Sequence, residues 1–131
     1  MSLFDDTIAQ WRRSDFVWGQ ADCLLSVGDY VHAARPDLPD VSARFRGTYD
    51  TEEGAMAHVE AHDGCEGLLD LFGLDRTETP VRGDIAVIWT GETDVGALCA
   101  GDTFVLRLER GTVEINARFV ELVAAWSVSG G

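Results

Sequence analysis

The chain has 131 residues, 46% hydrophobic and 25% charged, which is close to the average for a globular domain and disfavours intrinsic disorder. It has 23 acidic and ten basic residues, so the formal net charge is −13, and every basic residue is Arg. Binding to phosphate backbones or to anionic membranes needs clustered Lys and Arg, so we expect neither nucleic acid nor a membrane as partner. The length predicts one domain over residues 1–131.

Targeting and cysteine signals are weak. No apolar run approaches the length of a membrane-spanning helix, which is about 18 residues or more. Two acids follow Leu3-Phe4, where a secretory signal would be basic, so we expect a cytoplasmic protein. The three cysteines, Cys23, Cys65 and Cys99, form no C-x-x-C motif. A disulfide framework and a Cys-rich zinc site are therefore disfavoured, and we expect no metal and no other cofactor.

The first part of the chain, about residues 1–75, has helical patterns. Apolar residues recur at helical spacing in the first segment, and Asp22 is placed to cap the second. A capping-box spacing at residues 50–53 predicts the start of a third helix. The predicted helices cover residues 3–13, about 22–34, from 50–53 to about His62, and a short stretch over 68–72 that ends at Gly73, with 35–49 as an ordered loop.

Residues 83–128 have strand patterns instead. The apolar run Ile85–Trp89 lies between Gly83-Asp84 and Gly91, as in a buried strand. Further short segments alternate apolar and polar residues. The predicted strands cover residues 85–89, 95–100, 104–108, 113–115 and 123–128. A helical first part followed by an antiparallel meander of strands is typical of the α+β class.

The segment around Cys23 contains the strongest candidate for a catalytic residue. A cysteine in the first turn of a helix lies near unpaired N–H groups and the positive end of the helix dipole, which stabilise the nucleophilic thiolate. The other interpretation is that Cys23 is a small buried residue, as most free cysteines are. Trp18 and Gly19 would shape the turn before the helix, and Trp18 is a candidate pocket wall.

Several motifs resemble one known superfamily. Residues 18–23, W-G-x-x-D-C, resemble the nucleophile motif of the NlpC-like cell-wall cysteine peptidases, which are papain-like. Residues 82–88 resemble that family's R-G-D-hydrophobic strand, and 95–102 resemble its next strand and hairpin turn. These matches follow the family's order over residues 16–108. Arg46-Gly47-x-Tyr49 with Gly54-Ala55 resembles a phage- and prophage-associated branch whose function is not established.

The resemblance implies a papain-like α+β fold of NlpC type. Its N-terminal helices would place Cys23 at a helix N-terminus, packed on a C-terminal antiparallel sheet of about five strands. Cys23 would be the nucleophile, and Trp18, Asp22 and Tyr49 are the candidate binding residues. The superfamily's general base is a His, and the matching position here is Asp94. A third polar residue, often His, falls at about Leu106, so neither expected His is present.

Other bases for Cys23 are also doubtful on chemical grounds. The pKa of a carboxyl such as that of Asp94 lies about 4.5 units below that of a thiol, which makes the proton transfer unfavourable by roughly 6 kcal/mol. His32 lies nine residues further along the same predicted helix, about 13.5 Å away. His58 and His62 have i, i+4 spacing on the third helix, which leaves open solvated residues, a metal pair or a base for Cys23.

Two functions remain from the sequence. The first is a catalytically impaired NlpC/papain-like domain, phage- or prophage-derived, in the cytoplasm or a phage particle, that binds a peptide, a cell-wall fragment or a phage tail protein. The alternative is a cysteine peptidase or amidase that cleaves peptide or cell-wall amide bonds through Cys23 with a non-standard base. The acidic surface opposes affinity for an anionic wall and favours the first. Arg44 and Arg46 would either clamp a carboxylate or pair with local acids.

Overall fold

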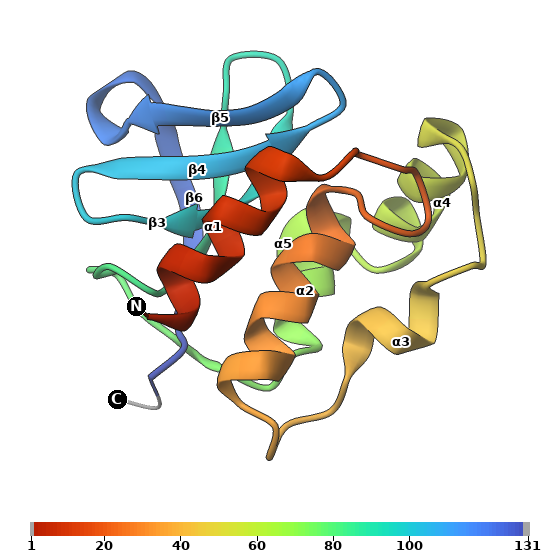
Figure 1. Cartoon of the computed structure of the whole chain (residues 1–131), viewed down its shortest axis with the longest axis horizontal. Coiled ribbons are helices and arrows are strands. Elements are labelled where there is room, and N and C mark those ends of the chain that lie inside the picture. Colours follow the sequence, from red (N-terminus) through yellow and green to blue (C-terminus); the bar gives the residue numbers. More distant parts are fainter. Residues whose placement is uncertain (1, 130–131) are drawn as a thin grey trace.

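The computed structural model describes residues 2–129, with helices first and strands second (Figure 1). The α+β class predicted from the sequence is therefore confirmed. The helices are α1 (Leu3–Arg13), α2 (Cys23–Ala34), α3 (Val41–Phe45), α4 (Glu52–Ala61) and α5 (Gly64–Asp70). The strands are β1 (Asp75–Arg76), β2 (Ile85–Trp89), β3 (Asp94–Cys99), β4 (Thr103–Leu108), β5 (Gly111–Asn116) and β6 (Glu121–Ser127), with a 3₁₀ helix η1 (Ala117–Phe119) before β6.

Within residues 2–129, four of the five α-helices begin directly after a residue whose side chain caps the helix. The Asp22 carboxylate accepts a hydrogen bond from the N–H of Leu25 and caps α2, as predicted. The predicted cap of α4 was wrong by one residue, because Thr51 rather than Asp50 accepts from the N–H of Gly54. The predicted loop over 35–49 contains α3, which Asp40 caps. A helix of five residues is too short to show a periodic pattern in the sequence.

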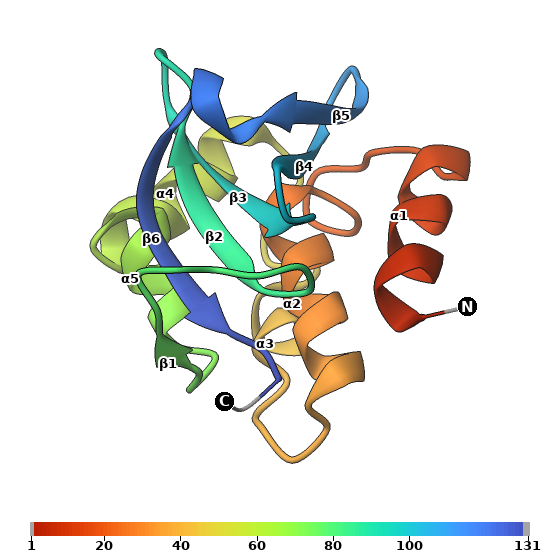
Figure 2. The same cartoon turned by 90° about the vertical axis from the view of Figure 1, so that its left-hand side faces the viewer.

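The strands form one six-stranded antiparallel sheet in the order β1-β6-β2-β3-β4-β5. All five predicted strands are present, and the two-residue β1 is an addition. The predicted meander is right for β2 to β5 but wrong for the last strand. That strand, β6, returns to lie beside β2 (Figure 2), and its Trp126 is the register partner of Ile85.

The central strands are buried on both faces, which explains their continuous apolar sequence. Because side chains alternate along a strand, Ile85 and Val87 of β2 face the helices, where they join the larger core cluster. Ala86 and Ile88 face the other way and join a second cluster. Figure 2 shows β5 and η1 on that side of the strongly curled sheet. The second cluster includes Cys99, Phe104 and Leu106, with Ile115, Ala117 and Val120 packed against it.

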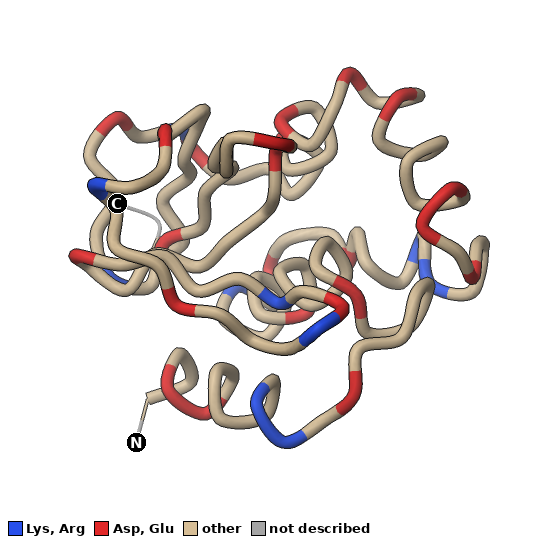
Figure 3. Tube along the Cα trace, turned by 90° about the horizontal axis from the view of Figure 1, so that it is seen from above, with Lys and Arg blue, Asp and Glu red and all other residues tan. Residues whose placement is uncertain are grey.

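The acidic residues are spread over helices, strands and loops, as expected from their even distribution in the sequence (Figure 3). Among residues 2–129, no helix has both the length and the apolar character to cross a membrane.

Candidate functional site

The turn before α2 is a tight loop closed by its own backbone. Val17 and Ala21 pair across it, with N–H to O distances of 3.2 and 2.8 Å, and Trp18-Gly19-Gln20 form its tip. Gly19 has φ +81°, a conformation that a residue with a side chain adopts only with strain. Trp18 is half-buried and packs edge-on against Phe16, with ring centroids 4.8 Å apart.

Asp22 fixes this turn to the helix that follows. Its side chain is buried, with 1% of the residue exposed. Oδ1 accepts from the N–H of Leu25 at 3.0 Å, and Oδ2 accepts from the N–H of Gly19 at 3.0 Å. Oδ2 also accepts from the hydroxyl of Tyr49. With both oxygens occupied, Asp22 holds the site together and offers no surface to a ligand.

Tyr49 belongs to a second loop that is attached to the same turn. The N–H of Gly47 donates to the carbonyl of Gly19 at 2.9 Å, and Arg46 Nε donates to the carbonyl of Gln20 at 3.2 Å. A β-carbon on Gly19 would lie 1.8 Å from the Tyr49 carbonyl oxygen, so only glycine permits this approach. Burial, followed by the hydrogen bond to Asp22, raises the pKa of Tyr49. Tyr49 is therefore a neutral donor that joins the two loops.

Cys23 is the first residue of α2, as predicted, but its surroundings oppose the thiolate. Burial, then the charge of Asp22 and then Cys65, raise the pKa of the Cys23 thiol from 9.0 to about 12. The N–H groups of Leu24 and Cys23 act in the opposite direction but do not outweigh burial. Cys23 itself is half-buried, and of the two interpretations left open by the sequence its raised thiol pKa favours the protonated, unreactive thiol.

Asp94 lies at the first position of β3 and is exposed. Its carbonyl oxygen lies 3.6 Å from the sulfur of Cys65, not of Cys23. Burial and the charge of Asp94 raise the pKa of Cys65 to about 11. Leu106, at the position of the superfamily's third polar residue, is buried in the second core cluster on the far face of the sheet. The structure thus pairs Asp94 with a different cysteine from the one that the resemblance implies.

The histidines also have other partners. His58 Nε2 lies 3.0 Å from Thr48 Oγ1, and His62 Nδ1 lies 2.9 Å from the His58 carbonyl. Both rings pack against Phe45, with centroids 5.2 and 5.3 Å away. His32 Nε2 lies 3.8 Å from a carboxylate oxygen of Asp40. Across residues 2–129, no histidine hydrogen-bonds the Cys23 sulfur, and no group of three or more His, Cys, Asp or Glu could hold a metal ion.

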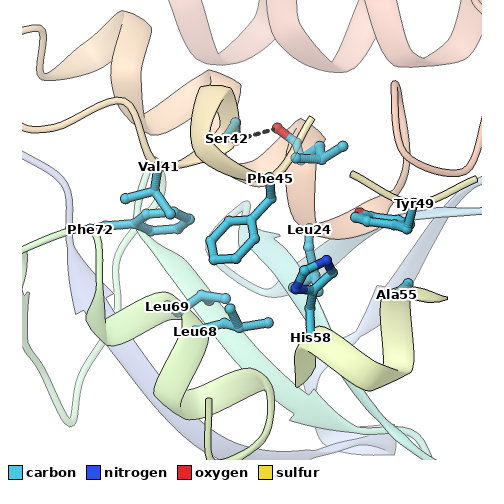
Figure 4. Close-up of a pocket in the computed structure, with 11 residues that line it drawn as sticks. Leu24, Val41, Ser42, Phe45, Tyr49, Ala55, His58, Leu68, Leu69 and Phe72 are labelled. Carbon is cyan, nitrogen blue, oxygen red and sulfur yellow. Dashed lines mark hydrogen bonds between the residues drawn. The ribbon is translucent and has the colours of Figure 1, made fainter. Parts of the chain in front are cut away.

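An apolar cavity lies behind Tyr49, between α2 and helices α3 to α5 (Figure 4). Phe45 and His58, whose rings pack together, both line it. Its volume of about 30 Å³ holds little more than one water molecule. The cavity is therefore too small for a peptide or sugar.

Three arginines near the site have different surroundings. Arg46 Nη2 lies 2.5 Å from Asp29 Oδ2, so Arg46 pairs with a local acid, one of the two predicted outcomes. Arg44 lies over the Phe45 ring at 5.2 Å. Arg107 on β4 is buried, a feature that the sequence interpretation missed because a charged residue in an alternating strand normally faces solvent.

Comparison with known proteins identifies the family to which the chain belongs. A family model described as a domain of unknown function, DUF6950, matches residues 2–128. The chain belongs to this family. No curated protein and no solved structure matches the chain. The match covers both loops of the site, the helices and the whole sheet.

Proposed function

We propose that this DUF6950 domain is a catalytically impaired relative of the NlpC-like, papain-fold peptidases, phage- or prophage-derived, and that it binds a partner instead of cleaving an amide bond. The observation that carries the proposal is the state of Cys23. By the resemblance it corresponds to the nucleophile at the start of α2, yet its thiol pKa is raised to about 12 and no histidine hydrogen-bonds its sulfur within the described residues.

The arrangement of the motifs supports the relationship to that superfamily. Helix α2 packs across β3, so that a β-carbon on Gly96 would be in ordinary van der Waals contact with Leu24 Cδ2 at 3.5 Å and Val27 Cγ2 at 3.8 Å. Asp84, in the R-G-D motif before β2, is buried and accepts from the N–H groups of Val81 and Val128 at 2.9 and 3.1 Å. Asp84 therefore has a structural task that persists without catalysis.

The chemistry argues against hydrolysis. A thiol of pKa about 12 is ionised to about one part in 10⁵ at pH 7, against a few per cent for an ordinary thiol. A positioned base typically contributes roughly 10²–10⁴-fold, and no histidine hydrogen-bonds the Cys23 sulfur among residues 2–129. The acidic surface repels anionic wall polymers, which favours a peptide or a tail protein over a cell-wall fragment as partner.

The pH dependence of alkylation tests the proposal. The folded protein would be treated with iodoacetamide between pH 6 and 11, and the modification of each cysteine followed by peptide mass spectrometry. We expect Cys23 to react far more slowly than glutathione at every pH below 10, because its thiol stays protonated. Reaction of Cys23 with an apparent pKa below that of glutathione would overturn the proposal.

A hydrolysis assay separates the two functions directly. Muropeptides and an unstructured peptide would be incubated with the protein and with a Cys23→Ser variant, which keeps the size of the side chain. We expect no turnover by either protein. Cleavage by the wild type that is lost in Cys23→Ser would establish the peptidase alternative.

A further inference from the structure

A cleft between α1 and α2 ends on a buried arginine. Its volume is about 420 Å³, within the size range of small-molecule sites. The floor is buried and includes Trp11, Ser26 and Arg107, whereas the rim, which includes Gln10 and Ala33, is exposed. None of its lining residues lines the cavity of Figure 4, and Cys23 does not line it. The cleft is thus a separate site.

Arg107 reaches the floor from β4 and has only neutral partners. It is 5% exposed. Nη1 donates to Ser26 Oγ at 3.3 Å, and Nη2 donates to Ser14 Oγ at 2.8 Å and to the Asp15 carbonyl at 2.9 Å. A guanidinium has five N–H groups. Two of them therefore have no acceptor within residues 2–129.

The acids nearest to Arg107 are committed elsewhere. Asp22 is occupied by its three donors described above, and Asp29 pairs with Arg46 at 2.5 Å. Asp15 offers only its carbonyl oxygen. Burial lowers the pKa of Arg107 despite the charges of these three acids. A buried cation without a paired anion is unfavourable, and an anionic ligand would relieve that cost.

We propose that this cleft binds a small monocarboxylate, with its carboxylate at Arg107 and its apolar part against Trp11 and Leu3. Arginine suits a carboxylate because its N–H groups form charge-assisted hydrogen bonds. The net charge of −13 repels ligands with several negative charges, which selects a single one. The exposed side-chain amide of Gln10 on the rim could hydrogen-bond a polar substituent of the ligand.

Binding is measured by titrating the ¹⁵N-labelled protein with acetate, hexanoate and benzoate at constant ionic strength and following amide shifts. We expect saturable shifts in residues 7–14 and 26–33, strongest with hexanoate or benzoate. Hexanamide and benzamide, which match these probes without the charge, should bind at least about tenfold more weakly. Equal binding of the amides, or no saturable binding of any carboxylate, would overturn the proposal.

Two pairs of variants locate the site. Arg107→Gln should weaken carboxylate binding by about tenfold or more, whereas Arg13→Gln, an exposed arginine on α1, should leave it unchanged. Because Arg107→Gln also removes hydrogen bonds that hold the structure, a second pair uses the exposed Ala33 on the rim. Ala33→Glu should abolish binding by repulsion, and Ala33→Gln should retain it. Undiminished binding in Ala33→Glu would refute this location.

Discussion

Replacement of Asp22 by Ala tests whether the joined loops depend on one carboxylate. The change removes the cap of α2, which costs about 1 kcal/mol. It also leaves the N–H of Gly19 and the hydroxyl of Tyr49 without their acceptor, at about 1–2 kcal/mol each where burial keeps water away. We therefore expect Asp22→Ala to lower the free energy of unfolding by about 3–5 kcal/mol.

The assay is urea unfolding at pH 7, followed by tryptophan fluorescence and circular dichroism. The matched control is Asp40→Ala, because Asp40 caps α3 with a single bond of 3.2 Å to the N–H of Ala43 and is exposed. That control should cost about 1 kcal/mol or less. If Asp22→Ala proves unfolded, Asp22→Asn keeps one acceptor for the cap and should lie between the two.

Two results would refute this reasoning. One is a loss in Asp22→Ala no larger than that in Asp40→Ala, which would mean that water replaces the buried carboxylate at little cost. The other is a Tyr49→Phe variant as stable as the wild type, which would mean that the hydroxyl contributes nothing. We expect Tyr49→Phe to lose about 1 kcal/mol.

Three further predictions concern the thiols and the turn. Asp94→Asn should lower the pKa of Cys65, because the Asp94 charge disfavours the Cys65 thiolate, and should leave the pKa of Cys23 unchanged; site-resolved alkylation measures both, and equal shifts at the two cysteines would contradict the assignment. Gly19→Ala should destabilise the protein by at least about 2 kcal/mol in urea unfolding, whereas Gly91→Ala, also at positive φ but in open space, should cost about 1 kcal/mol; equal losses would exclude a clash at Gly19. The folded state keeps Cys23 protonated up to about pH 12, whereas the unfolded chain ionises near 9.0. The free energy of unfolding should therefore fall as the pH rises from 9.0 to about 12, and it should fall less in Cys23→Ala than in the wild type. An equal fall in both proteins would exclude Cys23 as the cause.

Local signals in the sequence predict most of the helices and strands. Asp22 and Pro36 bracket α2 because capping and chain-breaking act over a few residues. The run Ile85–Trp89 predicts a strand because five consecutive apolar or small residues between glycine turns need burial on both faces. The short α3 and β1 escape such reasoning, because five and two residues carry no periodic pattern.

The pairing of strands that lie far apart in the sequence cannot be predicted from local sequence patterns. Residues 123–128 predict a strand, but nothing in them specifies β2 as a neighbour, because pairing depends on the whole sheet. Arg107 shows the same limit at the candidate sites. Its polar position in β4 predicts an exposed side chain, and only the placement of α1 and α2 over that strand makes it buried. Cys23 at a helix start was predictable, whereas its raised pKa follows from tertiary burial.

The place of β6 in the sheet bears on the synthesis of the protein. Chains emerge from the ribosome N-terminus first, and domains fold as units. Here Trp126, which is fully buried in the helix-side core, comes 103 residues after Cys23 at the start of α2. The nascent helices and the β2–β5 hairpins must therefore wait with an open core face until β6 has left the ribosome. During translation this apolar face stays uncovered until β6 pairs with β2.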